Sequence, residues 1–255
     1  MKSIGLKVTF AAVALLAAAA PALADDPAPA AADFGTVSAY VAMESDYRFR
    51  GISQNDRDFT PEASINWTGP MGFYAGTWVA KTNWGIPNNN PSLELDIYGG
   101  KHFDLGGTDL NVEAYYYSYP DYNTYGGAAA SYFEMQGYLS HTFGKLTLTA
   151  EGAYSPQWSL GGKDGWYAAG TAAYAITDWF SLSGTVGHQW VQLAPTDYTH
   201  YDVGGTFTWR SWTLDLRYVG NDIKSSDAGF WIGTPGGTKD GFKANLTFNV
   251  ADIFK

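Results

Sequence analysis

The sequence contains no cysteine among its 255 residues. A disulfide framework, a thiolate metal site and a thiol nucleophile are therefore excluded. Basic residues are also scarce, because 15 Lys and Arg stand against 25 Asp and Glu, and the formal net charge is −10. Phosphate recognition needs clustered Lys and Arg. We therefore expect no nucleic-acid partner.

Long apolar runs are missing as well, with one exception at the start of the chain. Lys2 and Lys7 precede or border an apolar stretch, residues 8–20, which leads to the small-x-small motif at residues 22–24. This stretch is shorter than the ~20 residues that a spanning helix needs. Its pattern is typical of a secretory signal peptide, and the alternative is a retained amphipathic anchor. We predict a signal peptide over residues 1–24, followed by a flexible periplasmic lead-in of Pro and Ala over residues 25–35.

The rest of the chain lacks a helical period and shows period-two alternation instead. Aromatic residues make up 16% of the sequence, and there are 30 glycines. In "LELDIYGG", residues 93–100, Leu and Ile fall on one side, while Glu, Asp and Tyr fall on the other. Such alternation indicates a β-strand with one apolar and one polar face.

Twelve segments share this alternation and are predicted to be strands. The segments 73–83 and 165–175 have the weakest pattern, because Gly and Ala blur their faces. The predicted strands cover residues 36–50, 60–68, 73–83, 92–101, 110–119, 131–141, 146–155, 165–175, 180–190, 200–209, 212–220 and 241–250.

The connections between these segments alternate between tight and long. The tight ones are residues 69–72, 102–109, 142–145, 176–179 and 210–211, and the others are long and polar. An even number of antiparallel strands, with short turns at one end and long loops at the other, is the plan of outer-membrane barrels. We therefore predict an all-β protein, a closed antiparallel transmembrane β-barrel of 12 strands over residues 36–255.

A soluble β-sandwich is the alternative, since its strands also have one polar face. Two features argue against it. Aromatic residues gather beside the tight turns, as at Trp67, Phe73, Trp179, Trp209 and Trp212, where a membrane interface would hold them. An open sheet of this size would also leave two exposed edges, which closure removes.

The stretch "SDYRFRG", residues 45–51, continues the alternation of the first predicted strand. If Val41 faces lipid, then Tyr47 and Phe49 face outward as well, at the extracellular aromatic belt. Arg48 and Arg50 then point into the lumen, because a lipid-facing arginine near mid-membrane costs about 2–4 kcal/mol.

The same alternation assigns mostly acidic side chains to the lumen. The lumen-lining candidates are Glu44, Asp46, Arg48, Arg50, Glu62, Glu94, Asp96, Glu113, Glu134, Glu151, Asp202, Asp215, Arg217 and Lys243. Twelve strands leave room for a narrow passage, and rings of carboxylates favour cations. We expect a porin-like passive channel for small hydrophilic solutes or ions with a weak cation preference. The alternative is a plugged or structural barrel with little conductance, in which the acids pair locally with the arginines.

Two stretches carry a family resemblance: "VAMESDYRFRGISQ", residues 41–54, and "SINWTGPMGFYAGTWVAKTNW", residues 64–84. They resemble the TorF family of proteobacterial outer-membrane porins, with weaker similarity in "LELDIYGG", "YYYSYPDY" and "YFEMQGYLS". The likeness runs through most of the predicted mature chain and is strongest over residues 40–84. It implies a β-barrel in the bacterial outer membrane and a pore function. It transfers no ligand or catalytic residue.

An outer-membrane enzyme is a further class, and it would need a positioned His with Ser or Asp. His102 and His141 lie beside predicted tight turns, and His200 has acids but no serine close in sequence. We predict no catalytic site, metal site or cofactor. The expected partners are outer-membrane lipid, lipopolysaccharide and the transported solutes or ions.

Tyrosines are frequent in residues 115–125. We attribute them to an interface belt and to loop packing, and the alternative is an aromatic track that guides sugars.

Overall fold

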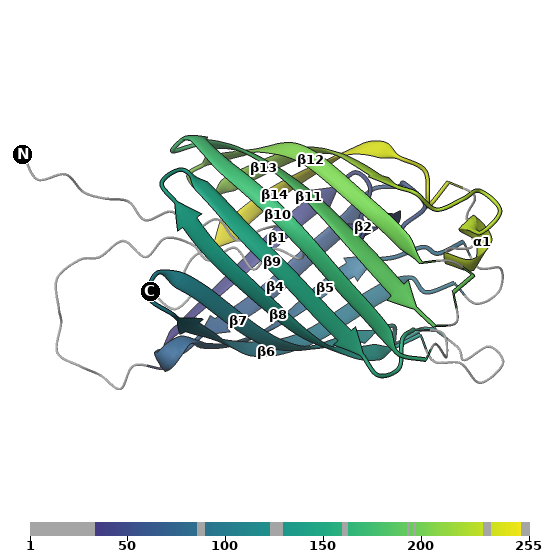
Figure 1. Cartoon of the computed structure of the whole chain (residues 1–255), viewed down its shortest axis with the longest axis horizontal. Helices are drawn as coiled ribbons and strands as arrows, with labels where there is room; N and C mark the ends of the chain where they lie inside the picture. Colours follow the sequence, from purple (N-terminus) through teal and green to yellow (C-terminus); the bar gives the residue numbers. More distant parts are fainter. Residues whose placement is uncertain are drawn as a thin grey trace, which may run out of the picture.

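The computed structural model describes residues 34–85, 90–122, 130–159, 163–192, 194–195, 197–231 and 236–250. Within them, twelve strands form one closed antiparallel barrel (Figure 1). The predicted signal peptide, residues 1–24, lies outside the described residues, as does most of the predicted lead-in. No helix within the described ranges is long and apolar enough to cross a membrane.

Each predicted strand overlaps one strand of the barrel, so the predicted fold class is confirmed. The barrel strands are β1 (Thr36–Glu44), β4 (Thr60–Thr68), β5 (Phe73–Lys81), β6 (Leu93–Asp104), β7 (Thr108–Ser118), β8 (Tyr132–Phe143), β9 (Leu146–Ser155), β10 (Gly165–Thr177), β11 (Phe180–Val191), β12 (Tyr198–Trp209), β13 (Trp212–Asn221) and β14 (Gly241–Val250). The short elements are β2 (Arg48–Phe49), β3 (Ile52–Ser53), the 3-10 turn η1 (Pro70–Gly72) and α1 (Ala228–Trp231).

The barrel closes because β1 has a partner on each side. Thr36 pairs with Thr68 of β4, and Ala39 pairs with Val250 of β14. Every other barrel strand pairs with its neighbours in sequence order. The sheet therefore has no free edge, and its backbone groups find their partners within the ladder.

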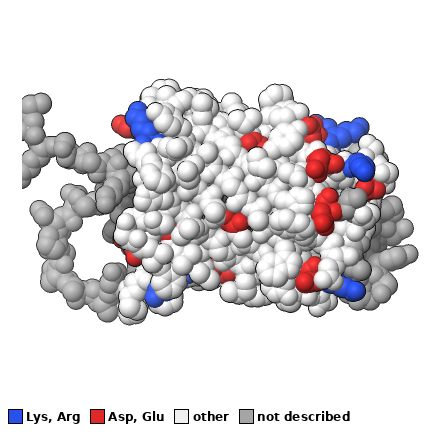
Figure 2. Space-filling view, in the orientation of Figure 1, with Lys and Arg blue, Asp and Glu red and all other residues white. Residues whose placement is uncertain are grey.

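The two faces of the wall differ as the alternation predicts. Val186 and Val203 lie on the outside and are each 59% exposed, whereas Asp96, on the inside, is 0% exposed. On the visible surface, charged side chains lie chiefly toward the two ends, and the band between them is mostly uncharged, with a few acidic atoms in view (Figure 2). An outward apolar band with a polar interior is typical of a barrel that crosses a lipid bilayer.

Aromatic side chains border this band at the end with the tight turns. Trp179, Trp209 and Trp212 are all exposed, and the rings of Phe180 and Phe207 stack with centroids 4.5 Å apart. This is the position that amphipathic rings take where an apolar surface meets water.

The first predicted strand, residues 36–50, was predicted to end too late. β1 stops at Glu44, and Ser45 is held by the backbone of Ala244 through two hydrogen bonds of 2.8 and 2.9 Å. Residues 45–59, which we call the inner loop, then leave the wall and enter the lumen. Figure 1 shows β2, part of this loop, toward the same end of the barrel as α1.

Tyr47 and Phe49 consequently do not face outward as predicted. The Tyr47 ring packs edge-on against Trp78, with ring centroids 5.2 Å apart. The Phe49 ring packs against Tyr117 inside the barrel, at 5.4 Å. The alternation of this stretch belongs to a separate hairpin, because Phe49 pairs with Ile52 and Arg48 with Ser53.

Adjacent small residues on β10 offer a test of the assigned faces. Ala172 is exposed on the outside, and Thr171 lines the internal cavity. Ala172→Lys should lose about 2–4 kcal/mol of folding free energy in a bilayer, because its charge meets hydrocarbon. Thr171→Lys should lose much less, because its charge meets an acidic, hydrated lumen. Urea titration of refolded protein in lipid vesicles measures both, and equal losses would contradict the face assignment.

Candidate functional site

The barrel contains an internal cavity of about 150 Å³. Its lining comes from the inner loop and from inward residues of most barrel strands. The charged lining residues are Glu44, Arg48, Arg50, Glu62, Glu151, Asp202, Asp215, Arg217 and Lys243. The other predicted lumen residues, Asp46, Glu94, Asp96, Glu113 and Glu134, are buried around it.

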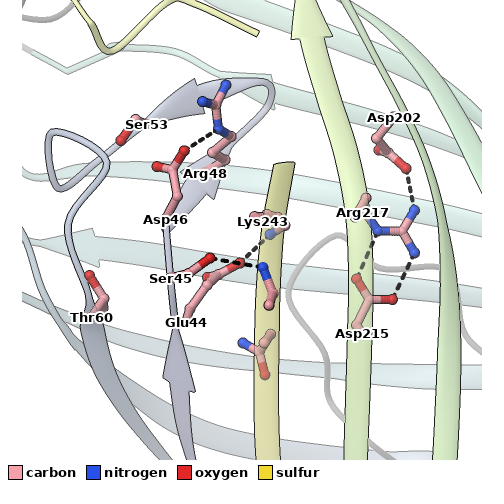
Figure 3. Close-up of polar contacts among 12 residues, drawn as sticks. Glu44, Ser45, Asp46, Arg48, Ser53, Thr60, Asp202, Asp215, Arg217 and Lys243 are labelled. Atoms are coloured by element: carbon pink, nitrogen blue, oxygen red, sulfur yellow. Dashed lines mark hydrogen bonds and ion pairs between the residues drawn. The ribbon is translucent and has the colours of Figure 1, made fainter. Parts of the chain in front are cut away.

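A compensated group of charges lies on β12, β13, β14 and the end of β1. The Arg217 guanidinium donates to Asp202 and, through Nε and Nη2, to both oxygens of Asp215 at 3.0 Å (Figure 3). Arg217 pairs in register with Lys243, and two like charges opposite each other are unfavourable. The Lys243 ammonium donates to Glu44 across the β14–β1 seam, which offsets this repulsion (Figure 3).

The tip of the inner loop, Arg50 and Gly51, contacts the far wall of the lumen through the Arg50 side chain. Its guanidinium donates two bonds of 2.9 Å to the Glu134 carboxylate on β8, and Nη1 also donates to Gln189 Oε1 on β11 at 2.8 Å. The same guanidinium stands 3.9 Å from the ring centroid of Tyr167 on β10. Two parallel hydrogen bonds between a guanidinium and a carboxylate fix the orientation of the Arg50 side chain and also pair its charge.

The backbone at this tip explains why the chain can turn so tightly. Arg50 has φ 46° and Gly51 has φ 84°, and together they form the two-residue turn between β2 and β3. Two left-handed residues in succession indicate a type I′ hairpin turn. A Cβ on Gly51 would lie 2.6 Å from the Cβ of His200, so only glycine fits at this position.

Behind the tip, Arg48 is tied to its own loop. Arg48 Nε donates to Asp46 Oδ2 at 2.7 Å (Figure 3), and Nη1 donates to the Gly51 carbonyl at 3.3 Å. Among the described residues, Asp46 Oδ1 and Arg48 Nη2 are buried without a hydrogen-bond partner. The polar atoms of the inner loop are therefore not all hydrogen-bonded in this position.

Several inward carboxyl groups have no basic side chain at ion-pair distance within the described part of the chain. These are Glu62, Glu94, Asp96, Glu113 and Glu151. Tyr115 OH donates to Asp96 at 2.9 Å, and Tyr74 OH donates to Glu113 at 2.9 Å. The interior thus carries an excess of acids over bases.

Tyrosines fill the lumen on the side of β6 to β8. The rings of Tyr98 and Tyr115 stack at 5.1 Å, and those of Tyr117 and Tyr132 stack at 4.5 Å. Tyr115 and Tyr117 are buried, so their assignment to an interface belt is wrong. They form the interior surface on which the inner loop packs. Tyr125 lies outside the described residues.

Sequence reasoning missed the lumen partners of the inner loop. Gln189, Tyr167 and His200 are buried inside the barrel, and His200 Nε2 lies 2.8 Å from the Tyr167 hydroxyl. An Arg-Gly pair between alternating residues is a weak hairpin signal compared with Asn-Gly. The partners on β10 to β12 have no local signal at all, because the barrel alone brings them near residue 50.

This arrangement can now be compared with known proteins. Residues 28–254 match the family model described as "Bacterial protein of unknown function (Gcw_chp)". The chain belongs to this family. No curated protein matches the chain.

Solved structures share the fold of this Gcw_chp member. The NanC porin is 8% identical, with a TM-score of 0.55, and the match covers 83% of this chain and 97% of the porin. An outer membrane channel from Pseudomonas putida F1 is 12% identical, with a TM-score of 0.53, and the match covers 89% of this chain and 100% of the channel. Identities this low establish a common fold and nothing more.

The compensated charges around Arg217 generate a stability prediction. Arg217→Met should lose about 3–5 kcal/mol, because Asp202 and Asp215 would remain buried without their base. Adding Asp202→Asn and Asp215→Asn should recover most of this loss, since neutral amides need no counter-ion. Urea unfolding in lipid vesicles compares the single and triple variants. Equal stability of the two would contradict charge compensation as the reason for this cluster.

Proposed function

We propose that this protein is a narrow outer-membrane channel for small hydrophilic solutes or ions, with a weak preference for cations. The observation that carries the proposal is a closed barrel around a cavity whose lining includes charged side chains, with inward acids that lack basic partners. The fold shared with porins and channels supports it, as does the resemblance of residues 40–84 to the TorF family.

The proposed location is the bacterial outer membrane. The apolar outer band and the exposed tryptophans at the short-turn end support this location. Residues 1–24 would direct export and be removed, and residues 25–35 would form a periplasmic lead-in to the barrel. Outer-membrane lipid and lipopolysaccharide would then surround residues 36–255.

The proposed cation preference follows from the balance of charge inside. Arg217 and Lys243 are neutralised by Asp202, Asp215 and Glu44, so these groups leave little net positive potential. Glu113 and Glu151 have no such partners, and carboxylates that line a passage favour cations over anions. Nothing in this account requires a catalytic role.

A plugged barrel with little conductance is the second candidate, and the inner loop favours it. Glu134 and Tyr117 are each 1% exposed and Gln189 is 0% exposed where the loop meets the far wall. No solute could pass this contact as it stands. The channel proposal therefore requires that the contact open, whereas the plugged barrel requires that it stay closed.

Reversal potentials in planar bilayers test the selectivity. The wild-type protein should pass cations more readily than anions under a salt gradient, and Glu113→Gln/Glu151→Gln should shift the permeability ratio toward one. Asp178→Asn is the matched control, because Asp178 is an acid in an exposed short turn outside the lumen. Anion preference in the wild type would contradict the charge argument. Absence of current in every variant would favour the plugged barrel.

A further inference from the structure

The inner loop is attached to the barrel differently from the strands of the wall. β2 and β3 form a separate two-stranded sheet that does not join the ladder of the wall. The tip is held instead by side chains, of which Arg50 makes the charged contacts to Glu134 and Gln189. The second half of the loop is also held by main-chain bonds, because Ser53 N donates to the Gly237 carbonyl at 2.9 Å and Asn83 N donates to the Gln54 carbonyl at 2.8 Å. A tip held by side chains can move on this anchored base while the barrel stays closed.

We propose that the inner loop is an internal gate and that Arg50 and Glu134 are its latch. This inference rests on the proposed channel function and adds regulation to it. In the closed state Arg50 bridges the lumen, from the chain between β1 and β4 to the walls at β8 and β11. In the open state the tip leaves Glu134, and the cavity becomes continuous with the extracellular mouth.

The far wall loses the Arg50 hydrogen bonds when the latch opens, but it keeps others. Glu134 Oε2 also accepts from Gln136 Nε2 at 3.0 Å, so the carboxylate retains a protein donor without Arg50. Gln189 Nε2 donates to the carbonyls of Trp166 and Trp190 at 2.9 and 3.3 Å. Opening therefore leaves the wall in order, and water can take the place of the guanidinium.

The loop, by contrast, gains from opening. Asp46 Oδ1 and Arg48 Nη2 are buried without a hydrogen-bond partner among the described residues in the closed position, and buried polar groups without partners are unfavourable. Arg50, Asp56 and Arg57 hold positive φ angles of 46°, 57° and 65°, which L-residues adopt at a cost. Both features lower the free-energy difference between the docked and released positions.

Aromatic packing opposes this release and keeps the closed state dominant. Tyr47 contacts Trp78, Phe49 contacts Tyr117, and Asn221 Nδ2 donates to the Gly51 carbonyl at 3.1 Å. A buried ion pair contributes little net stability but is costly to break on one side only. The Arg50–Glu134 pair thus suits a switch between two positions better than a permanent brace.

Because the chain has no native cysteine, a reversible crosslink between two introduced cysteines can be made without reaction at other thiols. Phe49→Cys/Tyr117→Cys places one thiol on the loop and one on the wall, where a short bis-thiosulfonate reagent can join them. Single-channel recording should show opening events before crosslinking, their loss afterwards, and their return on reduction. The control is Thr142→Cys/Thr147→Cys, a neighbouring pair on β8 and β9, whose crosslink should leave the openings unchanged. Equal opening in the locked and reduced states would overturn the gate.

Glu134→Gln tests the latch itself. Folding of the variant is verified by the change in electrophoretic mobility of the barrel on heating. This change leaves the Arg50 charge buried without a counter-ion only in the closed state. The fraction of time open should rise about tenfold or more, the factor expected when a hydrogen bond between charged groups is lost. Glu113→Gln, which removes a lumen carboxylate that does not touch Arg50, should alter selectivity without raising the open fraction. An unchanged open fraction in Glu134→Gln would overturn the latch.

A variant in which a Gly-Ser linker replaces residues 46–58 separates the two proposals. It should conduct steadily, because the barrel remains and the gate is absent. Steady conduction by both this variant and the wild type would overturn the gate while leaving the channel intact. A folded linker variant that passes no current would overturn the channel, and the gate with it.

Discussion

Closure of the sheet is the constraint on which the rest of the structure depends. Hydrocarbon offers no hydrogen-bond partner to a backbone amide. Every backbone N–H and C=O group of a sheet in contact with hydrocarbon must therefore pair within the sheet. β1 meets this demand by pairing with β4 on one side and β14 on the other. The closed wall then divides the side chains into two populations. Apolar groups face outward, with exposed tryptophans at the border of the apolar band, and most of the charged groups of the strands are confined inside together with many tyrosines.

Confinement imposes its own requirement on the interior, because charges removed from bulk water need nearby compensation. Arg217 and Lys243 receive it from acids on adjacent strands, while Arg50 receives it from across the lumen. Local pairs of the first kind stiffen the wall. The long-range pair has a different consequence, since it ties a loop to a surface that would otherwise be free. The same chemistry therefore serves both the barrel and its proposed gate.

The sequence predicted the wall well because the wall obeys a local rule. In β6, for example, Leu95 and Ile97 alternate with Glu94 and Asp96, and a period of two is sufficient to assign each face. Composition and alternation thus led to the strand number, the tight turns and the inward acids. The boundaries moved by a few residues, as where β6 runs on to Asp104.

The inner loop could not be predicted in the same way. Residues 45–50 continue the alternation of β1, so the pattern placed Tyr47 and Phe49 on the outside. What ends the strand is a set of contacts to Ala244, nearly two hundred positions later in the chain. What holds the tip is Glu134 and Gln189, separated from Arg50 by 84 and 139 positions. No short stretch of sequence around residue 50 contains these partners.

These separations also determine the order in which the molecule can be assembled. The inner loop follows the first strand, yet its docking surface is made by β8 to β11, which come much later in the chain. Contacts so distant in sequence form late, because the intervening chain must be ordered first. The loop tip therefore cannot dock until the strands that carry Glu134 and Gln189 are present. The first loop of the chain thus reaches its final position only through strands that follow it by 84 and 139 positions.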